Sequence, residues 1–408
     1  MVNDGKNKQI AIAAGGTGGH LFPALALAQI MLQSGYKIFF ITDKNFFKFK
    51  EQFNIIINNK NFSLYCLKIK RRNGTIGRFK MAVESLLAIF AVARYCVTNK
   101  IKGVVGFGSY VSLPSVIGGF LVGKKTIIHE QNKVLGLSNK ISSWFVSVCA
   151  CGFPETKGFH WLNIKKAVFV GNPVREEFTK LHTIKTNNER QGNFYESALM
   201  FKTVNSINIL IIGGSQGASV FKDIVSPALC KLPLKIRRKL KVYQQVTEGQ
   251  KNEVKQLFDK FGIRCVVETF FNNVSELMSS AHLFIGRAGA STIAEIECIG
   301  VPSVIIPYPE AANDHQTQNA LFLQQNGGAI VINQNGVTVR KLLKTIETIL
   351  SSEQELLSIS EKTKKLAEPF AATKMAIIVE TVIFGHSALF VSNYKTGIIS
   401  DSGLKVRQ

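Results

Sequence analysis

The sequence lacks several features that assign many proteins to a class at once. No uninterrupted apolar run is long enough to span a bilayer, because the nearest one, at residues 81–97, contains Glu84 and Arg94. A signal peptide is not expected, because the apolar residues that start at Ile10 are interrupted by two glycines at 15–16. We therefore expect a soluble or membrane-peripheral protein.

Motifs for structural metals and for common phosphate chemistry are also missing. The seven cysteines include no C-x-x-C pair, and Cys149 and Cys151 are too close together for the usual zinc spacing. We interpret the cysteines as reduced thiols of a cytoplasmic protein, mostly packed in its core. No D-x-D pair is present to hold a divalent cation on a nucleotide diphosphate. No G-x-x-x-x-G-K-[ST] loop is present either, which excludes P-loop chemistry.

Acidic residues are few. There are 27 Asp and Glu against 50 Lys and Arg, so the net charge is +23. Such a charge attracts polyanions, and it leaves nucleic acid, anionic lipid and phosphorylated substrates open as partners. The 408 residues suffice for two or three domains, and a hydrophobic content of 46% argues against long disordered tracts.

Strand-like and helix-like segments alternate along the chain. A β-branched strand at 9–14 is followed by a glycine-rich turn, a helix at 21–33 and a strand at 36–41. This alternation predicts an α/β fold with parallel, doubly wound sheets. The other predicted strands lie at 103–105, 126–128, 148–150, 167–170, 207–212, 241–246, 264–268, 283–285 and 303–306, and a closing helix lies at 364–383.

The pattern of a strand and a glycine-rich turn occurs twice. G-G-T-G-G-H follows the first strand, and G-G-S-Q-G-A follows the strand at 207–212, so each half of the chain starts in the same way. The predicted division is a first domain at 1–172, a linker with an extended polar insertion at 173–206, a second domain at 207–362, a C-terminal helix at 363–384 and a tail at 385–408.

Each glycine-rich turn lies between a strand and a helix N-terminus. Without side chains, backbone N–H groups can approach an anion, and the helix end adds partial positive charge. One such turn is explained as well by tight packing, but two matched turns favour phosphate binding. Neither is a strict dinucleotide fingerprint, since Leu21 stands where G-x-G-x-x-G requires glycine. Asp43 lies near the position of a ribose-binding acid, which keeps a nicotinamide dehydrogenase open.

A second set of ligand contacts is predicted in residues 285–320. Two strands there end beside the N-terminus of a helix that carries Glu295, and open α/β sheets bind ligands at such a crevice. Polar side chains such as Arg287 and Gln316 suit a sugar phosphate better than an apolar ligand.

His20 directly follows the first glycine-rich turn. A lone His at a turn often only packs or caps it, but its place beside the expected cleft favours a general base or an acceptor-positioning group. Tyr110 and the polar tetrad 129–132 also follow strands, and packing alone does not explain four polar residues in a row. In the absence of an acid pair for a metal, helix N-termini and arginine are expected to neutralise a leaving group.

The segment 68–90 combines basic and apolar side chains. One interpretation is a solvated basic loop before a core helix. The other is an interfacial patch, whose apolar side chains enter lipid while its basic ones bind anionic headgroups. Nucleic acid is disfavoured, because no ladder of aromatic and basic residues accompanies the charge.

Together these motifs resemble the MurG family, the UDP-N-acetylglucosamine transferases that add the second sugar to the undecaprenyl-linked peptidoglycan precursor. The resemblance covers nearly the whole chain, from G-G-T-G-G-H-L-F-P-A-L-A-L-A through G-N-P-V-R and G-G-S-Q-G-A to R-A-G-A-S-T-I-A-E and D-H-Q-T-Q-N-A. It implies the GT-B glycosyltransferase fold, with the donor mainly on the C-terminal domain, the lipid acceptor on the N-terminal one and a C-terminal helix that returns to the first domain. It implies an inverting transfer that needs no metal or other cofactor.

The resemblance also implies roles for single residues. His20 is the implied base, and Glu295, grouped with it as catalytic, takes the ribose hydroxyls. The implied substrate-binding residues are Thr17, Gly18, Gly19, Tyr110, Asn132, Arg175, Ser215, Phe271, Arg287, Ala290, Ser291, Thr292 and Gln316. The implied membrane patch consists of Arg71, Arg72, Ile76, Phe79, Lys80, Leu86 and Phe120.

The implied partners are UDP-N-acetylglucosamine, an undecaprenyl-linked acceptor (lipid I), an anionic membrane surface at the cytoplasmic face of the bacterial inner membrane, and other cell-wall synthesis proteins. Nucleic acid is not among them. Ser109 departs from the family pattern, which usually has a second glycine before Tyr110, so the shape of the acceptor loop stays open. The alternatives are a sugar-nucleotide epimerase of the same architecture, a nicotinamide dehydrogenase and a non-catalytic sugar-nucleotide binder.

Overall fold

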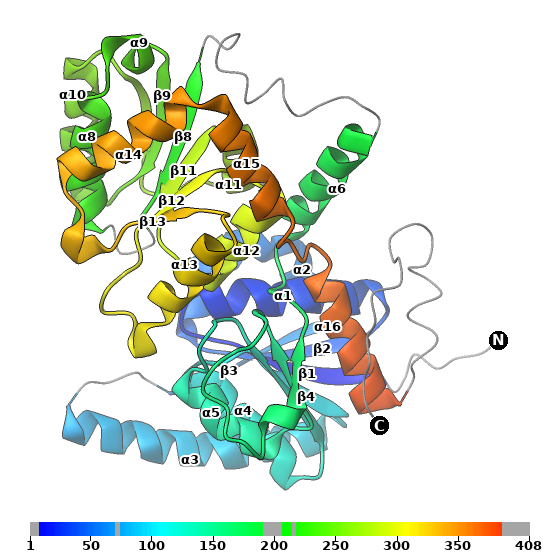
Figure 1. Cartoon of the computed structure of the whole chain (residues 1–408). Coiled ribbons are helices and arrows are strands. Elements are labelled where there is room, and N and C mark those ends of the chain that lie inside the picture. Colours follow the sequence, from blue (N-terminus) through cyan, green and yellow to red (C-terminus); the bar gives the residue numbers. More distant parts are fainter. Residues whose placement is uncertain (1–7, 70–73, 191–205, 214–217, 386–408) are drawn as a thin grey trace.

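The computed structural model describes residues 8–69, 74–190, 206–213 and 218–385. Its strands form two separate parallel sheets, one in each half of the chain, and helices pack on the faces of both sheets (Figure 1). The predicted α/β class with two doubly wound parallel sheets is therefore confirmed.

The first sheet has seven strands in the order β3-β2-β1-β4-β5-β6-β7. The sequence pattern predicts no strand at Phe62–Cys66, yet these residues form β3 at the edge of the sheet, where only Phe62 is buried. The other strands are β1 Gln9–Ala13, β2 Lys37–Thr42, β4 Gly103–Gly106, β5 Lys125–Glu130, β6 Val148–Cys151 and β7 Ala167–Phe169. The helices are α1 Gly18–Gln33, α2 Asn54–Ile57, α3 Thr75–Thr98, α4 Ser109–Leu121 and α5 Leu137–Ser142, with 3-10 turns at Lys44–Phe53, Ser143–Phe145 and Ile164–Lys166.

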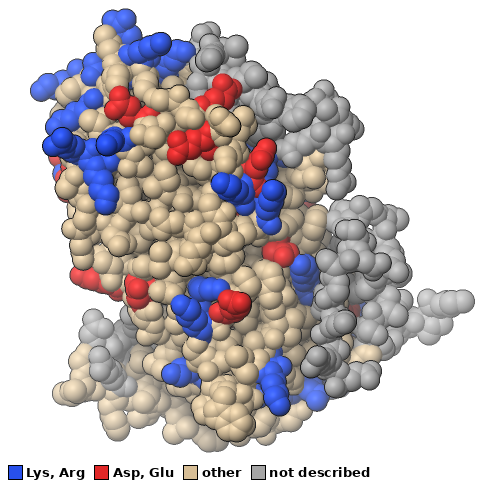
Figure 2. Space-filling view, in the orientation of Figure 1, with Lys and Arg blue, Asp and Glu red and all other residues tan. Residues whose placement is uncertain are grey.

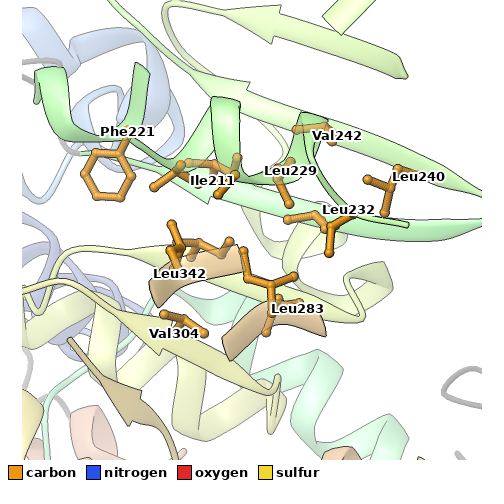
Figure 3. Packing of buried hydrophobic residues seen from close by; sticks show 14 of the residues in the cluster. Ile211, Phe221, Leu229, Leu232, Leu240, Val242, Leu283, Val304 and Leu342 are labelled. Atoms are coloured by element: carbon orange, nitrogen blue, oxygen red, sulfur yellow. The ribbon is translucent and has the colours of Figure 1, made fainter. Parts of the chain in front are cut away.

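The second sheet has six strands in the order β10-β9-β8-β11-β12-β13. Its core is apolar: Leu283 and Val304 from two neighbouring strands pack with Leu342 from a covering helix (Figure 3). The strands are β8 Ile207–Ile212, β9 Leu240–Gln245, β10 Arg264–Glu268, β11 Leu283–Gly286, β12 Ser303–Ile305 and β13 Ile330–Val331. The helices are α8 Ser226–Cys230, α9 Leu234–Arg237, α10 Lys251–Lys260, α11 Val274–Ser280, α12 Ala290–Ile299, α13 His315–Gln325, α14 Val339–Ser351 and α15 Glu353–Lys364, with a π-helical turn at Phe221–Val225.

The chain first crosses between the two halves near residue 175. Polar composition predicts a linker at 173–206, but its first part is the helix α6 Glu176–Arg190, whose first turn carries two acids that complement the helix dipole. His182 bonds to the carbonyl of Cys298 at 2.9 Å, and the buried Lys185 donates to that of Ile299 at 3.4 Å. This helix therefore packs against α12 of the second half.

The second crossing brings the chain back to the first sheet. One helix is predicted at 364–383, but α15 ends at Lys364, and the next helix, α16 Ala371–Val379, starts after Pro369, which has no N–H to donate. This helix packs against α1, and the π-helical turn Glu380–Phe384 that follows it lies against β5 of the first sheet (Figure 1). They bury Met375, Ala376, Ile378 and Val379 in the core that β1, β2 and α1 form.

Loss of one side chain in this returning helix should weaken the first half. Met375 is fully buried in the first core, so Met375→Ala leaves a cavity and should lower the free energy of unfolding by about 2–5 kcal/mol. Urea unfolding followed by circular dichroism measures this change. The exposed Glu361→Ala on α15 is the control and should change stability little. Equal stability of the two variants would contradict the docking of α16 on this core.

Candidate functional site

The loops at the carboxyl ends of the parallel strands meet between the two sheets. The loop after β1 carries residues 14–17 and leads into α1, the loop after β4 carries residues 107–108 and leads into α4, and the loop after β5 carries residues 131–136. From the second half, the loops after β11 and β12 carry residues 287–289 and 306–314. Neighbouring parallel strands end at the same edge of a sheet, and the bonds of Ser291 to Gly19 and of Asn319 to Asn132 bring the two edges together.

The first glycine-rich turn is packed too tightly for side chains. A Cβ atom at Gly15 would lie 2.5 Å from a methyl group of Val111, and Gly16 has a left-handed φ of 85°. Asp43 secures this turn, because its Oδ2 accepts from the Gly16 N–H at 3.1 Å and from the hydroxyl of Tyr110. The carboxylate of Asp43 is 2% exposed and is thus engaged inside the protein, which disfavours its role as a ribose-binding acid.

His20 lies in the first turn of α1, at the mouth of this loop. Its Nδ1 is 3.0 Å from Oε1 of Gln131, which follows β5. A Cβ atom at Gly108 would lie 3.2 Å from the His20 ring, so this glycine leaves room for the imidazole. Thr17 precedes the helix but its side chain makes no capping hydrogen bond, and Thr17 and Gly19 are exposed while Gly18 is half-buried.

Glu130 organises the polar tetrad. Its Oε1 accepts from the backbone and side-chain N–H groups of Asn132 at 3.0 and 3.1 Å. Its Oε2 accepts from Gly136 N at 3.0 Å and Asn139 Nδ2 at 2.9 Å. The carboxylate is 1% exposed and carries four donors, so it holds the loop at 131–136 in one shape.

Asn319 of α13 joins the two halves across the cleft. This fully buried amide donates to Oδ1 of Asn132 at 3.1 Å and to the carbonyl of Ala288 at 3.1 Å, and its own oxygen accepts from Lys133 N at 2.9 Å. Ser291 at the start of α12 reaches the carbonyl of Gly19 at 3.5 Å. The predicted residues Gly19, Asn132 and Ser291 are therefore brought together, with Ala290 and Thr292 beside Ser291.

An ion pair closes the cleft near the first crossing. Arg175 Nη2 is 3.0 Å from Oε1 of Glu295, and the guanidinium also lies over the rings of Phe22 and Phe178. Burial raises the pKa of the Glu295 carboxyl, and the charge of Arg175 lowers it again in part. The pair joins α12 to the start of α6 and places a cation beside α1.

Other predicted residues of the second half serve as supports. Arg287 donates to the carbonyls of Ile306 and Pro307 at 2.9 and 3.1 Å and to Gln334 at 2.7 Å, so its guanidinium holds the loop after β12. Gln316 accepts from Tyr308 N at 3.0 Å.

The side chain of Phe271 is buried in a core that also contains α12, and its ring meets Tyr243 edge-on. Ser215 lies outside the described residues.

The predicted membrane patch lies away from this cleft, on α3. Its buried side, with Ala88 and Val92, packs as part of the first half, while Ile76, Phe79, Leu86 and other apolar side chains are exposed. By length and composition α3 passes as a membrane span, but 22% of its most apolar window is buried in the protein. Lys80 on the same helix is exposed, as is Phe120 on α4, and Arg71 and Arg72 lie outside the described residues.

Among the described residues, no three His, Cys, Asp or Glu side chains lie close enough together to hold a metal ion. The charged groups of the cleft are instead paired within the protein, as Arg175 and Glu295 illustrate.

Comparisons with known proteins agree with this geometry. The model of the glycosyltransferase family 28 N-terminal domain matches residues 10–150, and that of the family 28 C-terminal domain matches residues 208–375. A relative from Wolbachia (strain wRi), named UDP-N-acetylglucosamine–N-acetylmuramyl-(pentapeptide) pyrophosphoryl-undecaprenol N-acetylglucosamine transferase, is 33% identical over 91% of this chain and 98% of its own length. The chain belongs to the MurG family of glycosyltransferases.

Other relatives and solved structures fit this family. A relative of the same name from Caulobacter vibrioides is 32% identical over 92% of this chain and 99% of its own. The crystal structure of Acinetobacter baumannii MurG is 29% identical, with a TM-score of 0.70, over 92% of this chain and 99% of that one. A UDP-GlcNAc 2-epimerase from Neisseria meningitidis shares the fold at 13% identity, with a TM-score of 0.60, over 92% of this chain and all of its own. The GT-B architecture is thus confirmed.

Sequence reasoning left three residues of the site without a role. The sequence pattern gives His129 and Gln131 only as members of the polar tetrad, and Asn319 only as part of the motif D-H-Q-T-Q-N-A. Their partners lie 42, 111 and 187 residues away along the chain, for His129–Gly171, Gln131–His20 and Asn319–Asn132 respectively. The sequence signal that could have indicated these residues is the clustering of polar side chains at the ends of predicted strands.

Replacing the organising carboxylate should loosen the site. In Glu130→Gln an NH₂ group takes the place of one oxygen and faces N–H donors, which should lower the free energy of unfolding by roughly 1–3 kcal/mol. Urea unfolding measures the loss, and Glu361→Gln at an exposed position is the matched control. A Glu130→Gln protein as stable as the control would show that the four contacts do not need the charge.

Proposed function

We propose that this chain transfers N-acetylglucosamine from UDP-N-acetylglucosamine to the 4-hydroxyl of the muramoyl sugar on an undecaprenyl diphosphate, which converts lipid I to lipid II in peptidoglycan synthesis. The names of relatives at 32–33% identity, matched over nearly their whole length, support this. The observation that carries it is the direct contact between the two family 28 domains beside His20, where Ser291 reaches the carbonyl of Gly19 and Asn319 bonds to Asn132.

In the proposed reaction His20 is the general base. Its ring takes the proton of the acceptor hydroxyl while that oxygen attacks the anomeric carbon of the donor sugar from the face opposite the nucleotide. The bond to the diphosphate breaks, UDP departs with the electron pair, and the configuration inverts. The N-terminus of α1 and the N-terminus of α12, together with Arg175, stabilise the negative charge on UDP. No divalent cation takes part in this proposal.

The second half is proposed to bind the donor. Glu295 takes the ribose hydroxyls, Gln316 the hydroxyls of the sugar, and backbone groups near Phe271 the uracil. Ser215 is proposed to bind a phosphate. The support comes from the family pattern and from the position of α12, whose first residues face Gly19 of the opposite loop.

The exposed face of α3 is proposed to rest on the anionic cytoplasmic surface of the inner membrane. The exposed fractions are 73% for Ile76, 71% for Phe79 and 54% for Leu86 on α3, and 47% for Phe120 on the neighbouring helix α4; adjoining exposed apolar side chains mark membrane or protein interaction sites. Ile76, Phe79 and Leu86 are three and seven residues apart along the chain, and such spacings fall on one side of an α-helix. In Figure 2, Lys and Arg gather mainly over the upper part of the molecule, where α9 and α10 lie, and the part around α3 is mostly uncharged in this view.

Transfer of labelled sugar to lipid tests the function. The purified protein, given labelled UDP-N-acetylglucosamine and the lipid-linked monosaccharide, should move label into the organic phase, and excess EDTA should leave the rate within about twofold, because helix ends and arginine take the place of a metal ion. Loss of transfer on chelation, restored by magnesium, would contradict the metal-independent mechanism.

The same assay separates the alternatives. His20→Ala should lower the rate at saturating substrates by about a hundredfold or more, since a general base contributes that much. Release of an epimerised sugar from the donor alone would favour the epimerase, and donor binding without any turnover would favour a binder.

Binding to anionic vesicles tests the membrane proposal. Phe79→Ser together with Leu86→Ser removes two exposed apolar side chains and should weaken binding to phosphatidylglycerol vesicles at least tenfold, since each buried side chain of this size contributes about 1.5–3 kcal/mol. Ile55→Ser together with Leu234→Ser, exposed apolar positions outside α3, is the matched control. Equal binding of both double variants would refute the patch.

A further inference from the structure

A chain of hydrogen bonds leads from the backbone of Gly171 to His20. His129 Nε2 lies 3.0 Å from the carbonyl oxygen of Gly171. Gln131 Nε2 lies 3.1 Å from His129 Nδ1 and 3.2 Å from the carbonyl oxygen of His129. Gln131 Oε1 in turn lies 3.0 Å from Nδ1 of His20. His129 and Gln131 are both buried, at 0% and 2% exposure.

The direction of every bond in this chain follows from its anchor. A carbonyl oxygen can only accept, so the Gly171 contact requires a proton on Nε2 of His129. Complete burial lowers the pKa of His129 to about 4, so this imidazole is neutral near pH 7 and its Nδ1 is an acceptor. Nδ1 therefore receives an N–H from the Gln131 amide, whose oxygen is left to face His20.

The last bond of the chain determines the state of His20. Because Gln131 Oε1 only accepts, Nδ1 of His20 must carry the proton. A neutral imidazole with a proton on Nδ1 has its lone pair on Nε2. We propose that His129 and Gln131 are positioning residues that hold His20 in the tautomer whose Nε2 accepts the proton of the attacking hydroxyl. This inference rests on the proposed function, because it specifies how its base is prepared.

The environment of the relay keeps it neutral and rigid. Phe107 stacks on His129 with ring centroids 5.3 Å apart, and the carboxylate of Glu130 bonds to Asn132, Gly136 and Asn139 instead of to the relay. The relay therefore presents Nδ1 of His20 with a neutral amide oxygen and not with a carboxylate.

The anchor of the relay lies where the chain crosses between the halves. Gly171 has a left-handed φ of 86°, and the side chain of Asn172 donates to the Gln131 carbonyl at 2.9 Å. The orientation of His20 therefore depends on the backbone at Gly171 and Asn172, which lie just before the chain first crosses between the halves.

Nitrogen NMR on the unaltered protein tests the tautomer directly. The protein is labelled with ¹⁵N-histidine and measured at a pH where His20 is neutral. His20 should then show a protonated Nδ1 and an unprotonated Nε2, and His129 a protonated Nε2 and an unprotonated Nδ1. The variants His20→Gln and His129→Gln assign the signals to the two residues. A His20 protonated on Nε2 overturns the inference, whatever the enzyme does. Absence of sugar transfer by the same sample would instead refute the proposed function.

Variants of Gln131 separate positioning from packing. Gln131→Met keeps the length of the side chain but removes the acceptor, so we expect His20 to populate both tautomers. We expect kcat to fall by up to about tenfold, while KM for the donor changes by less than twofold. Gln131→Glu keeps an acceptor for Nδ1 and adds a charge, so it should retain the tautomer and move the acidic limb of the kcat–pH profile up by roughly one unit.

Gln256→Met and Gln256→Glu, at an exposed position on α10, are the matched controls and should leave tautomer and profile unchanged. Should both Gln131 variants lose stability and activity alike, with the tautomer and the pH limb unmoved, Gln131 has only a packing role and the inference is overturned.

Discussion

Every strand in both sheets runs parallel to its neighbours, and the position of the site depends on this constraint. Parallel strands end at one edge of their sheet. Loops that are far apart in the sequence, such as those at Gly15 and Gln131, therefore lie next to each other as a direct result of the strand order. The two sheets present these edges to each other, and Asn319 bonds directly to the opposite loop. The start of α12 thereby comes to lie beside the first glycine-rich turn.

The sequence predicted the parts of this arrangement that depend on local pattern. An apolar strand followed by glycines predicted the turn near Gly15 and the start of the second domain at residue 207. Both could be predicted because the steric demand for glycine and the periodicity of apolar residues are local properties. The edge strand β3 and the helix α6 were missed, since the first is barely buried and the second is polar along most of its length. The contacts of His129 with Gly171 and of Gln131 with His20 were beyond prediction, because side-chain contacts over 42 or more residues need the tertiary fold.

Buried carboxylates near the site have a structural role. Asp43 and Glu130 are both nearly buried, and each already accepts hydrogen bonds from several backbone or side-chain donors of the protein. Their charge therefore holds loops and helices in place, as buried carboxylates with several donors commonly do. In the proposed mechanism an imidazole accepts the proton, and helix N-termini and Arg175 stabilise the negative charge of the leaving group.

The return of α16 to the first sheet has a consequence for the order in which the molecule is made. Met375 and Val379 complete a core whose other members, such as Ile10 and Leu25, leave the ribosome some 350 residues earlier. The first half thus emerges with an unfilled apolar groove beside α1, whereas the second half, whose core spans residues 207–356, can close as soon as it is synthesised. Synthesis of α16 then completes the core of the first half.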